Sequence, residues 1–337
     1  MTTHSPSSGS PEHVSLSTSP LSLSQVVAVA RGGATVSVTP EAVAAMLRSR
    51  SVVQAALDDG LPHYGINTGF GSLSRQRIAR QDLLTLQRNL IRSHSAGVGE
   101  PLCDEIVRGM MLLLAASQCR GMSGVRPEVP ELIVGMLNAG VTPIVPSKGS
   151  VGASGDLAPL SHLALVLIGE GEALFGGRRL SGADALKAAG LSPTTLDAKE
   201  GLALINGTHL MAASAAIAVA DCERLMEAAV LAGAMSIDAS RATDTSLDAR
   251  IHEARRQLGQ IAVAATMREH LRGSQIVASH TENDPRVQDP YCLRCAAQVI
   301  GAARDSIAGV RLVVERELGA VTDNPLVFGE GATGEII

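Results

Sequence analysis

The chain has 337 residues and a formal net charge of −5, from 33 acidic and 28 basic side chains. This balance gives no reason to expect nucleic acid or an acidic membrane surface as a partner, and the length allows about two average domains or one large helical body. The cysteines are scattered, no apolar run is long enough to span a membrane and the N-terminus lacks a signal-peptide pattern, so we expect a cytoplasmic protein.

The core must be built from Ala, Leu, Val, Ile and Met, because the chain has no Trp, three Phe and two Tyr. Ala-rich apolar sequences of this kind favour helices. Cys292 and Cys295 have the spacing of a metal or redox pair, but no second pair of Cys or His accompanies them. We therefore expect a mainly α protein without a metal site.

The N-terminal part of the chain is expected to begin with a disordered tail at residues 1–20, where Ser, Thr and Pro leave almost nothing apolar to bury. Two short strands are predicted at 26–30 and 34–38, followed by a helix at 40–57. Three glycines within residues 65–71 exclude a stable helix and predict a loop that presents side chains.

Most of the remaining chain shows helical periodicity. Helices are expected at residues 82–92, 104–121, 127–140, 159–170, 208–239, 247–271 and 289–318. Long helices of this kind bury their apolar stripes only by bundling. The sequence thus predicts an N-terminal domain at 21–205 and a central helical-bundle domain at 206–337.

Residues 149–156, Gly-Ser-Val-Gly-Ala-Ser-Gly-Asp, carry the most specific chemical pattern in the chain. The segment is compatible with a flexible turn. A phosphate-binding loop is disfavoured because its lysine and hydroxyl are missing and Asp156 would repel an anion. A hydrolase nucleophile elbow is disfavoured because Asp156 stands where that motif needs Gly.

The same residues also permit a covalent reaction within the backbone. If the chain bends tightly, the amide nitrogen of Gly155 can attack the carbonyl carbon of Ala153, and loss of water closes a five-membered ring. Loss of the Ser154 hydroxyl as a second water leaves an exocyclic methylene. That group is an electrophile that no ordinary side chain supplies.

Extended by Leu-Ala-Pro-Leu, this segment resembles the signature of the aromatic amino acid ammonia-lyases, which form the methylidene-imidazolone (MIO) prosthetic group autocatalytically. The resemblance implies that Ala153, Ser154 and Gly155 form MIO and that Asp156 binds it. It also implies the family's long-helix bundle with a loop-rich N-terminal active-site region, and a homotetramer whose active sites are shared between subunits. It covers the chain from about residue 20 to the end, and roughly the last third of the family's pattern is expected to be missing.

Tyr64 is the candidate base that removes the β-proton of the substrate. Read alone, it fits a buried tyrosine that anchors its loop. The stretch Tyr-Gly-Ile-Asn-Thr-Gly, which begins at Tyr64, resembles the family loop whose Tyr acts as the base. Tyr291, the other tyrosine of the chain, also lies in a family-like motif.

Residues 287–295 resemble the family motif in which an arginine binds the substrate carboxylate, which implies that role for Arg294. The same resemblance implies that Gln288 contacts the substrate and that Tyr291 is catalytic and touches MIO. Leu-Ile-Asn-Gly-Thr, which contains Asn206, resembles the motif whose Asn hydrogen-bonds both MIO and substrate. Read alone, Asn206 is a helix N-cap signal, and the sequence leaves both roles open.

His94 bears on the choice of substrate. A histidine at a helix end commonly serves as a C-cap or lies on the surface. Ser93-His94, however, resembles the pair with which histidine-type and tyrosine-type members of the family contact the substrate ring. The run Val-Gln-Asp-Pro-Tyr resembles the histidine type, whereas residues 242–246 depart from it.

The resemblance therefore implies an enzyme, a carbon–nitrogen lyase that eliminates ammonia from the amino acid L-histidine and gives trans-urocanate. A tyrosine ammonia-lyase or aminomutase, and a truncated family member without activity, remain the alternatives.

Overall fold

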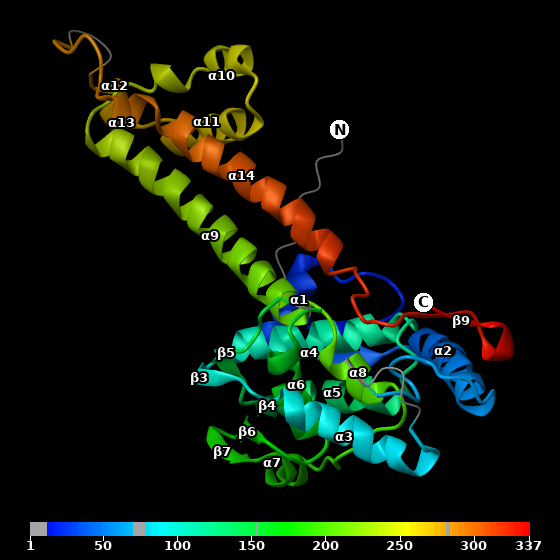
Figure 1. Ribbon diagram of the computed structural model, residues 1–337. Coiled ribbons are helices and arrows are strands. Elements are labelled where there is room, and N and C mark those ends of the chain that lie inside the picture. The colour runs from blue at the N-terminus through cyan, green and yellow to red at the C-terminus, as the bar shows by residue number, and fades with distance from the viewer. Residues whose placement is uncertain (1–11, 70–77, 153, 281–283) are drawn as a thin grey trace. The chain divides into compact units, whose positions relative to one another are not determined.

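Helices dominate the structure, and the strands are few and short (Figure 1). The computed structural model describes residues 12–69, 78–152, 154–280 and 284–337. Within these ranges, no helix combines the length and the apolar character needed to cross a membrane. The expectation of a mainly α protein is confirmed.

The chain divides into two compact units by its internal contacts. The first unit comprises the described residues up to Ile217 together with Glu315–Ile337, and the second comprises Ala218–Val314. The boundaries fall inside two long helices. The domains expected at 21–205 and 206–337 stay a prediction.

The first unit begins with a strand, a helix and a second strand, namely β1 (His13–Leu16), α1 (Leu23–Ala30) and β2 (Thr35–Val38). The two strands pair in parallel, with Val14 opposite Val36. The strand predicted at the position of β2 is confirmed.

Two predictions for this region are wrong. Disorder was expected throughout residues 1–20, but β1 is ordered. Its alternating apolar side chains, Val14 and Leu16, are buried. Residues 1–11 of the expected tail lie outside the described ranges. A strand was expected at 26–30, but the segment belongs to α1.

A capping box explains why α1 is a helix in spite of its valines. The hydroxyl of Ser22 accepts the N–H of Gln25 at 3.3 Å, and the side-chain oxygen of Gln25 accepts the N–H of Ser22 at 2.9 Å. Two backbone donors at the helix start are thereby satisfied. This local signal outweighs the β propensity of the valines that follow.

Helix α4 (Asp104–Cys119) is the central helix of the first unit. Residues 110–119 are all buried, so other elements must cover every side of this part of the helix. It packs against α1, α2 (Pro40–Asp58) and α5 (Glu128–Ala139). Helix α5 ends at Gly140, whose φ of 77° lies in the left-handed region that favours glycine at a helix end.

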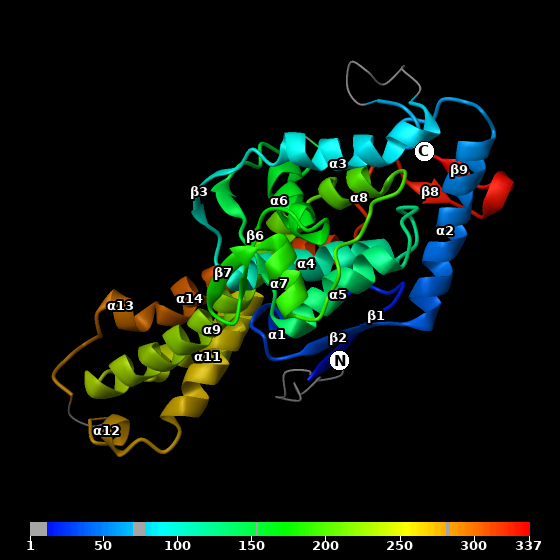
Figure 2. The same ribbon diagram turned by 90° about the horizontal axis from the view of Figure 1, so that it is seen from below.

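Helices α3 (Leu83–His94), α6 (Leu157–Leu167) and α8 (Glu200–Ile205) pack against one another (Figure 2). Every residue of α8 is buried, and so are most residues of α6. The ends of these three helices carry site residues predicted from the sequence.

Short elements complete the first unit. Their bounds are β3 (Val98–Pro101), β4 (Thr142–Pro143), β5 (Pro146–Lys148), β6 (Glu172–Phe175), β7 (Arg178–Ser181), α7 (Gly182–Ala188), β8 (Val327–Phe328) and β9 (Glu335–Ile336). Strand β3 pairs with β5, β6 pairs with β4 and β7, and β8 pairs with β9, all antiparallel. Gly176 and Gly177, both with left-handed φ, join β6 to β7.

The second unit is wholly helical apart from its loops, over the residues that the structure describes. Its helices are the C-terminal part of α9 (His209–Ala239), α10 (Ala249–Arg255), α11 (Leu258–Leu271), α12 (Gln275–Ala278), α13 (Tyr291–Arg294) and most of α14 (Ala296–Glu317). Apolar residues of α9, α11 and α14 form its core, including Val230, Met267 and Ala297.

Two helices predicted as continuous are interrupted. The helix expected at 247–271 breaks at Arg256, which has a left-handed φ of 65° and separates α10 from α11. The helix expected at 289–318 breaks at Cys295, between α13 and α14. The first break is two residues long, since Gln257 is also extended, and the second is one residue long. Periodicity alone does not reveal one or two residues that leave the helical conformation.

Candidate active site

Ser154 and Gly155 form a bend between β5 and α6. Both have left-handed backbone conformations, with φ of 62° and 91°. A Cβ atom at position 155 would overlap the carbonyl group of Gly207, with which Gly155 forms a β-bridge, so only glycine fits there. Ala153, the third residue of the predicted ring, lies outside the described residues.

Asp156 ties this bend to the start of α9. Its buried Oδ2 atom accepts the N–H groups of Leu210 at 2.9 Å and Met211 at 3.0 Å, and its Oδ1 accepts the Ser150 hydroxyl at 2.8 Å. Its own N–H donates to the Gly207 carbonyl at 2.7 Å. A carboxylate is stabilised at a helix N-terminus by the unpaired N–H groups and by the helix dipole. A contact of Asp156 with MIO stays a prediction.

Asn206 reaches Ser154 because α8 ends immediately before it. The Oδ1 atom of Asn206 accepts the Ser154 hydroxyl at 2.8 Å, and Nδ2 donates to the carbonyl of Asn324 at 3.0 Å. The reading of Asn206 as a helix N-cap is wrong. Its side chain is engaged by these two partners, and Asp156 caps the first amides of α9 instead.

These residues fit the MIO group. A ring built from residues 153–155 needs a backbone that turns back on itself, and the bridge between Gly155 and Gly207 holds the chain in such a bend. Asn206 holds the hydroxyl of Ser154, which is the group that must leave when the ring is completed. The bend and Asn206 are therefore the parts of this chain that would hold MIO.

Tyr64 lies in a turn that Asn67 stabilises. The Oδ1 atom of Asn67 accepts the N–H of His63 at 2.7 Å, and its Nδ2 donates to the carbonyl of Leu61 at 2.8 Å. Tyr64 is 44% exposed, so the alternative of a buried tyrosine that anchors its loop is wrong. Its role as a base stays a prediction, and residues 70–71 of the predicted loop lie outside the described ranges.

His94 is the last residue of α3. Its Nδ1 lies 2.8 Å from the carbonyl oxygen of Leu90, which can only accept, so Nδ1 carries the proton and the neutral ring keeps an acceptor at Nε2. The side chain thus satisfies a carbonyl in the last turn of its own helix, as the C-cap alternative expects. The Nε2 acceptor is equally compatible with the predicted contact to a substrate ring.

The loop after His94 packs against the loop that carries Ser154. The N–H of Gly97 donates to Nε2 of His162 on α6 at 3.1 Å. Burial lowers the pKa of His162, which favours the neutral ring that this contact needs. A Cβ atom at Gly149 would lie 3.1 Å from Cα of Gly97, so the two loops approach closely.

Gln288, Tyr291 and Arg294 lie together in the second unit. Arg294 donates to the side-chain oxygen of Gln288, and its guanidinium carbon lies 5.7 Å from the centre of the Tyr291 ring. Tyr291 and Arg294 are three residues apart on α13 and therefore neighbours on one face. The structure brings these three predicted residues together with one another, and their contacts with substrate stay a prediction.

Lys199, Asp323 and Asn324 make contacts at the two ends of α8, and these residues were not predicted from the sequence. Nζ of Lys199 lies 2.6 Å from Oδ2 of Asp323, and both side chains are buried. The available signal was Lys199 itself, because it is one of only three lysines in the sequence.

His209, the first residue of α9, is buried beside Gly207. Burial and the guanidinium of Arg120 lower its pKa to about 4, so the ring is neutral near pH 7. Over the described part of the chain, neither ring nitrogen has a hydrogen-bond partner.

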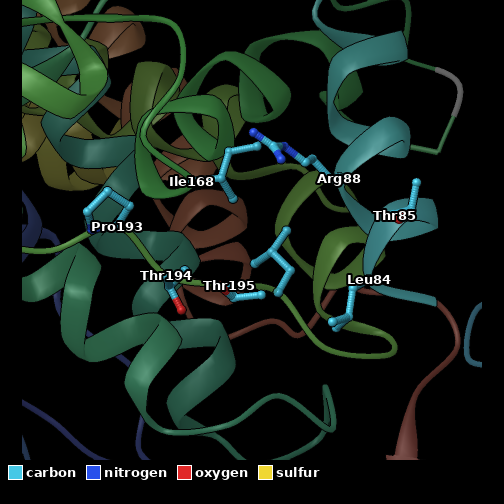
Figure 3. A pocket seen from close by; sticks show the side chains of 8 residues that line it. Leu84, Thr85, Arg88, Ile168, Pro193, Thr194 and Thr195 are labelled. Atoms are coloured by element: carbon cyan, nitrogen blue, oxygen red, sulfur yellow. The ribbon is translucent and has the colours of Figure 1, made fainter. Parts of the chain in front are cut away.

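A cavity of about 330 Å³ lies on the first unit (Figure 3). Its lining comprises Leu84, Thr85, Arg88, Ile168, Pro193, Thr194, Thr195 and Leu196. Arg88, the charged group among them, is paired with Glu170 at 2.6 Å. None of the predicted site residues lines this cavity, so we do not place the active site there.

Comparison with known proteins bears on these observations. Residues 21–337 match the aromatic amino acid lyase family. The chain is 52% identical over 325 residues to the curated histidine ammonia-lyase of Anaeromyxobacter sp. (strain K), with 94% of this chain and 64% of that protein covered.

Solved structures of similar proteins share the fold of this chain. The tyrosine aminomutase of Streptomyces globisporus has a TM-score of 0.87 at 35% identity, over 96% of this chain and 64% of that one. The histidine ammonia-lyase of Trypanosoma cruzi has a TM-score of 0.85 at 39% identity, over 96% of this chain and 60% of that one. The chain thus spans less than two thirds of the length of these relatives.

The fold expected from the resemblance is confirmed by these structures. Since the family match covers nearly the whole chain and the bend at Ser154 fits the family's prosthetic group, this chain belongs to the aromatic amino acid lyase family.

Proposed function

We propose that this protein acts as an MIO-dependent ammonia-lyase that eliminates ammonia from L-histidine and gives trans-urocanate. The observation that carries the proposal is the left-handed bend at Ser154 and Gly155, where Asn206 accepts the Ser154 hydroxyl at 2.8 Å. Histidine is favoured as the substrate because the curated relative at 52% identity is named histidine ammonia-lyase.

The MIO group, once formed, supplies an electrophile that activates the amino acid for loss of ammonia. The residues of this chain form and support it. Asn206 holds the Ser154 hydroxyl, while Asp156 and Gly207 hold the bend against the start of α9. Such fixed contacts lower the cost of bringing the reacting atoms together.

Binding of the substrate is assigned to four side chains, Arg294, Gln288, His94 and Asn206, and removal of the β-proton to Tyr64. Arg294 can bind the substrate carboxylate through two parallel N–H groups. The side-chain oxygen of Gln288 accepts a hydrogen bond from Arg294 and so orients its guanidinium group. His94 keeps an Nε2 acceptor that suits an imidazole N–H. Tyr64, whose ring is exposed, is the proposed base for the β-proton.

The proposal includes a cytoplasmic homotetramer with MIO as its prosthetic group. All five cysteines are free thiols, which suits a reducing compartment. Active sites shared between subunits are part of the proposal through the family resemblance.

Two measurements test the proposal. The intact mass of the folded protein should be lower than the sequence mass by two water molecules, and Ser154→Ala should abolish this deficit. Urocanate should accumulate from histidine, followed by its ultraviolet absorbance. A folded protein at full sequence mass would contradict the proposal, coumarate from tyrosine without urocanate would favour the tyrosine alternative, and a formed ring without either product would favour the inactive alternative.

A further inference from the structure

The same dipeptide, Asp323-Asn324, holds helix α8 at both of its ends. At the start of the helix, Nζ of Lys199 lies 2.6 Å from Oδ2 of Asp323. At its end, Nδ2 of Asn206 donates to the carbonyl of Asn324 at 3.0 Å. Oδ1 of Asp323 accepts the N–H of Asn324 at 2.7 Å, so the two contacts form one connected network.

The ion pair at the start of α8 is shielded from water, with side chains of Lys199 and Asp323 that are 0% and 3% exposed. An ion pair in this position is a poor source of stability, because desolvation of both charges offsets their attraction. Lys199 also has a left-handed φ of 74°, which is costly for a residue with a Cβ atom. These costs indicate that the role of the ion pair is to hold neighbouring groups in one arrangement.

The arrangement concerned is the orientation of the Asn206 amide. An Asn side chain can present either its oxygen or its NH₂ group to a neighbour, and the two have nearly the same shape. The carbonyl of Asn324 can only accept, so it keeps Nδ2 on its own side. Oδ1 therefore faces Ser154 and accepts its hydroxyl at 2.8 Å.

We propose that Lys199 and Asp323 are positioning residues for closure of the ring at residues 153–155. The inference rests on the proposed function, because it concerns formation of the same group. Through Asn324 and Asn206, the buried pair holds the Ser154 hydroxyl in one orientation while the backbone reacts.

The reaction that they position needs no oxidant or reductant. A bond forms between the nitrogen of Gly155 and the carbonyl carbon of Ala153. The carbonyl oxygen leaves as water with the amide protons of Ser154 and Gly155. The Ser154 hydroxyl leaves as a second water with the Cα proton of the same residue, and a carbon–carbon double bond remains.

Two double variants separate ring closure from folding. Lys199→Met/Asp323→Leu removes both charges, so no unpaired charge is left buried, and it also removes the Asp323 oxygen that binds Asn324. Lys199→Met/Asp323→Asn removes both charges but keeps a side-chain oxygen for the Asn324 N–H. Circular dichroism and thermal unfolding report folding, and intact mass over time after expression reports the cyclised fraction.

We expect Lys199→Met/Asp323→Leu to fold and to close its ring more slowly by a factor on the order of 10 to 100, since small misplacements of reacting groups cost that much. The Lys199→Met/Asp323→Asn variant should recover part of the rate. Such a rescue would not follow from loss of the ion pair alone, because both variants lack it.

Glu200→Gln is the matched control. Glu200 is adjacent to Lys199, its side chain is 0% exposed, and it pairs with Arg126 at 2.7 Å. Its hydrogen bonds lead to Arg126 and to the N–H of Asp197, away from the Asp323-Asn324 dipeptide. This variant should lose thermal stability and close its ring at the parental rate.

Parental ring closure in folded Lys199→Met/Asp323→Leu would overturn the inference. Failure of both double variants to fold would also overturn it, because the pair would then serve stability alone. A parent protein that folds at full sequence mass would instead overturn the proposed function and this inference with it. The parent's mass therefore distinguishes the two failures.

Discussion

The carboxylate of Asp156 accepts the backbone N–H of Leu210 at 2.9 Å, although 54 residues separate them in the sequence. The residue that follows the bend at Ser154 and Gly155 is therefore the cap of another helix, α9. This side chain therefore connects the bend at Ser154 to the start of α9, in addition to the backbone contacts with Gly207.

Substitution Asp156→Ala should lower the free energy of unfolding by about 1–3 kcal/mol, because two helix amides and the Ser150 hydroxyl lose their acceptor in a buried place. The same variant should close its ring poorly. Urea unfolding and intact mass measure the two effects. Ser181→Ala, which removes the cap of α7, is the control and should affect stability alone. If Asp156→Ala is cyclised to the same extent as this control, Asp156 does not contribute to ring closure.

Substitution His94→Leu should lower kcat/KM for histidine by roughly 10- to 100-fold, because a buried substrate N–H would lose its acceptor at Nε2. Ser93→Ala is the matched control on the same turn and should have a much smaller effect. Steady-state kinetics on both variants provide the measurement. Unchanged turnover of histidine by His94→Leu would leave only the capping of Leu90 as the role of this side chain.

Burial of His209 should make the protein less stable in mild acid. The folded protein keeps the ring neutral down to about pH 4, whereas the unfolded chain takes up the proton near the ordinary pKa of 6.5. Between these values the unfolded state binds more protons, so the free energy of unfolding falls as the pH falls from 6.5 to 4, by up to about 3 kcal/mol, and is unaffected above 6.5.

The variant His209→Leu should reduce this acid sensitivity, because no proton can bind at that position. Urea unfolding of parent and variant at pH 5 and pH 7 gives the comparison, and the other titrating groups are common to both proteins. Equal loss of stability in the two proteins between pH 7 and pH 5 would show that His209 does not cause it.

Substitution Gly155→Ala should disrupt the bend far more than Gly152→Ala. Both glycines have left-handed φ, 91° and 70°, so each substitution carries a backbone cost of about 1–2 kcal/mol. Only at position 155 does the added Cβ meet the carbonyl of Gly207, whereas nothing lies within 4 Å at position 152. Thermal unfolding and intact mass should show Gly152→Ala as mildly destabilised and cyclised, and Gly155→Ala as uncyclised; a cyclised Gly155→Ala would contradict the close fit.

Local signals in the sequence predicted the elements that depend on neighbouring residues. Pro40 begins α2 and Gly140 ends α5, because caps and breakers act within one turn of helix. The capping box of α1 is equally local, but its valines were read as a strand. The interruptions at Arg256 and Cys295 were missed because one or two non-helical residues barely alter an apolar pattern.

The sequence by itself predicted the tripeptide that we propose to cyclise, since that reaction would join atoms of three consecutive residues and the resemblance covers that segment. Only the tertiary structure decided which distant groups surround it. Asn206 reaches Ser154 across 52 positions, and Lys199 reaches Asp323 across 124. A hydrogen bond or ion pair between single polar side chains has no period along the chain, so these partners become evident only when packing of the helices brings their ends together.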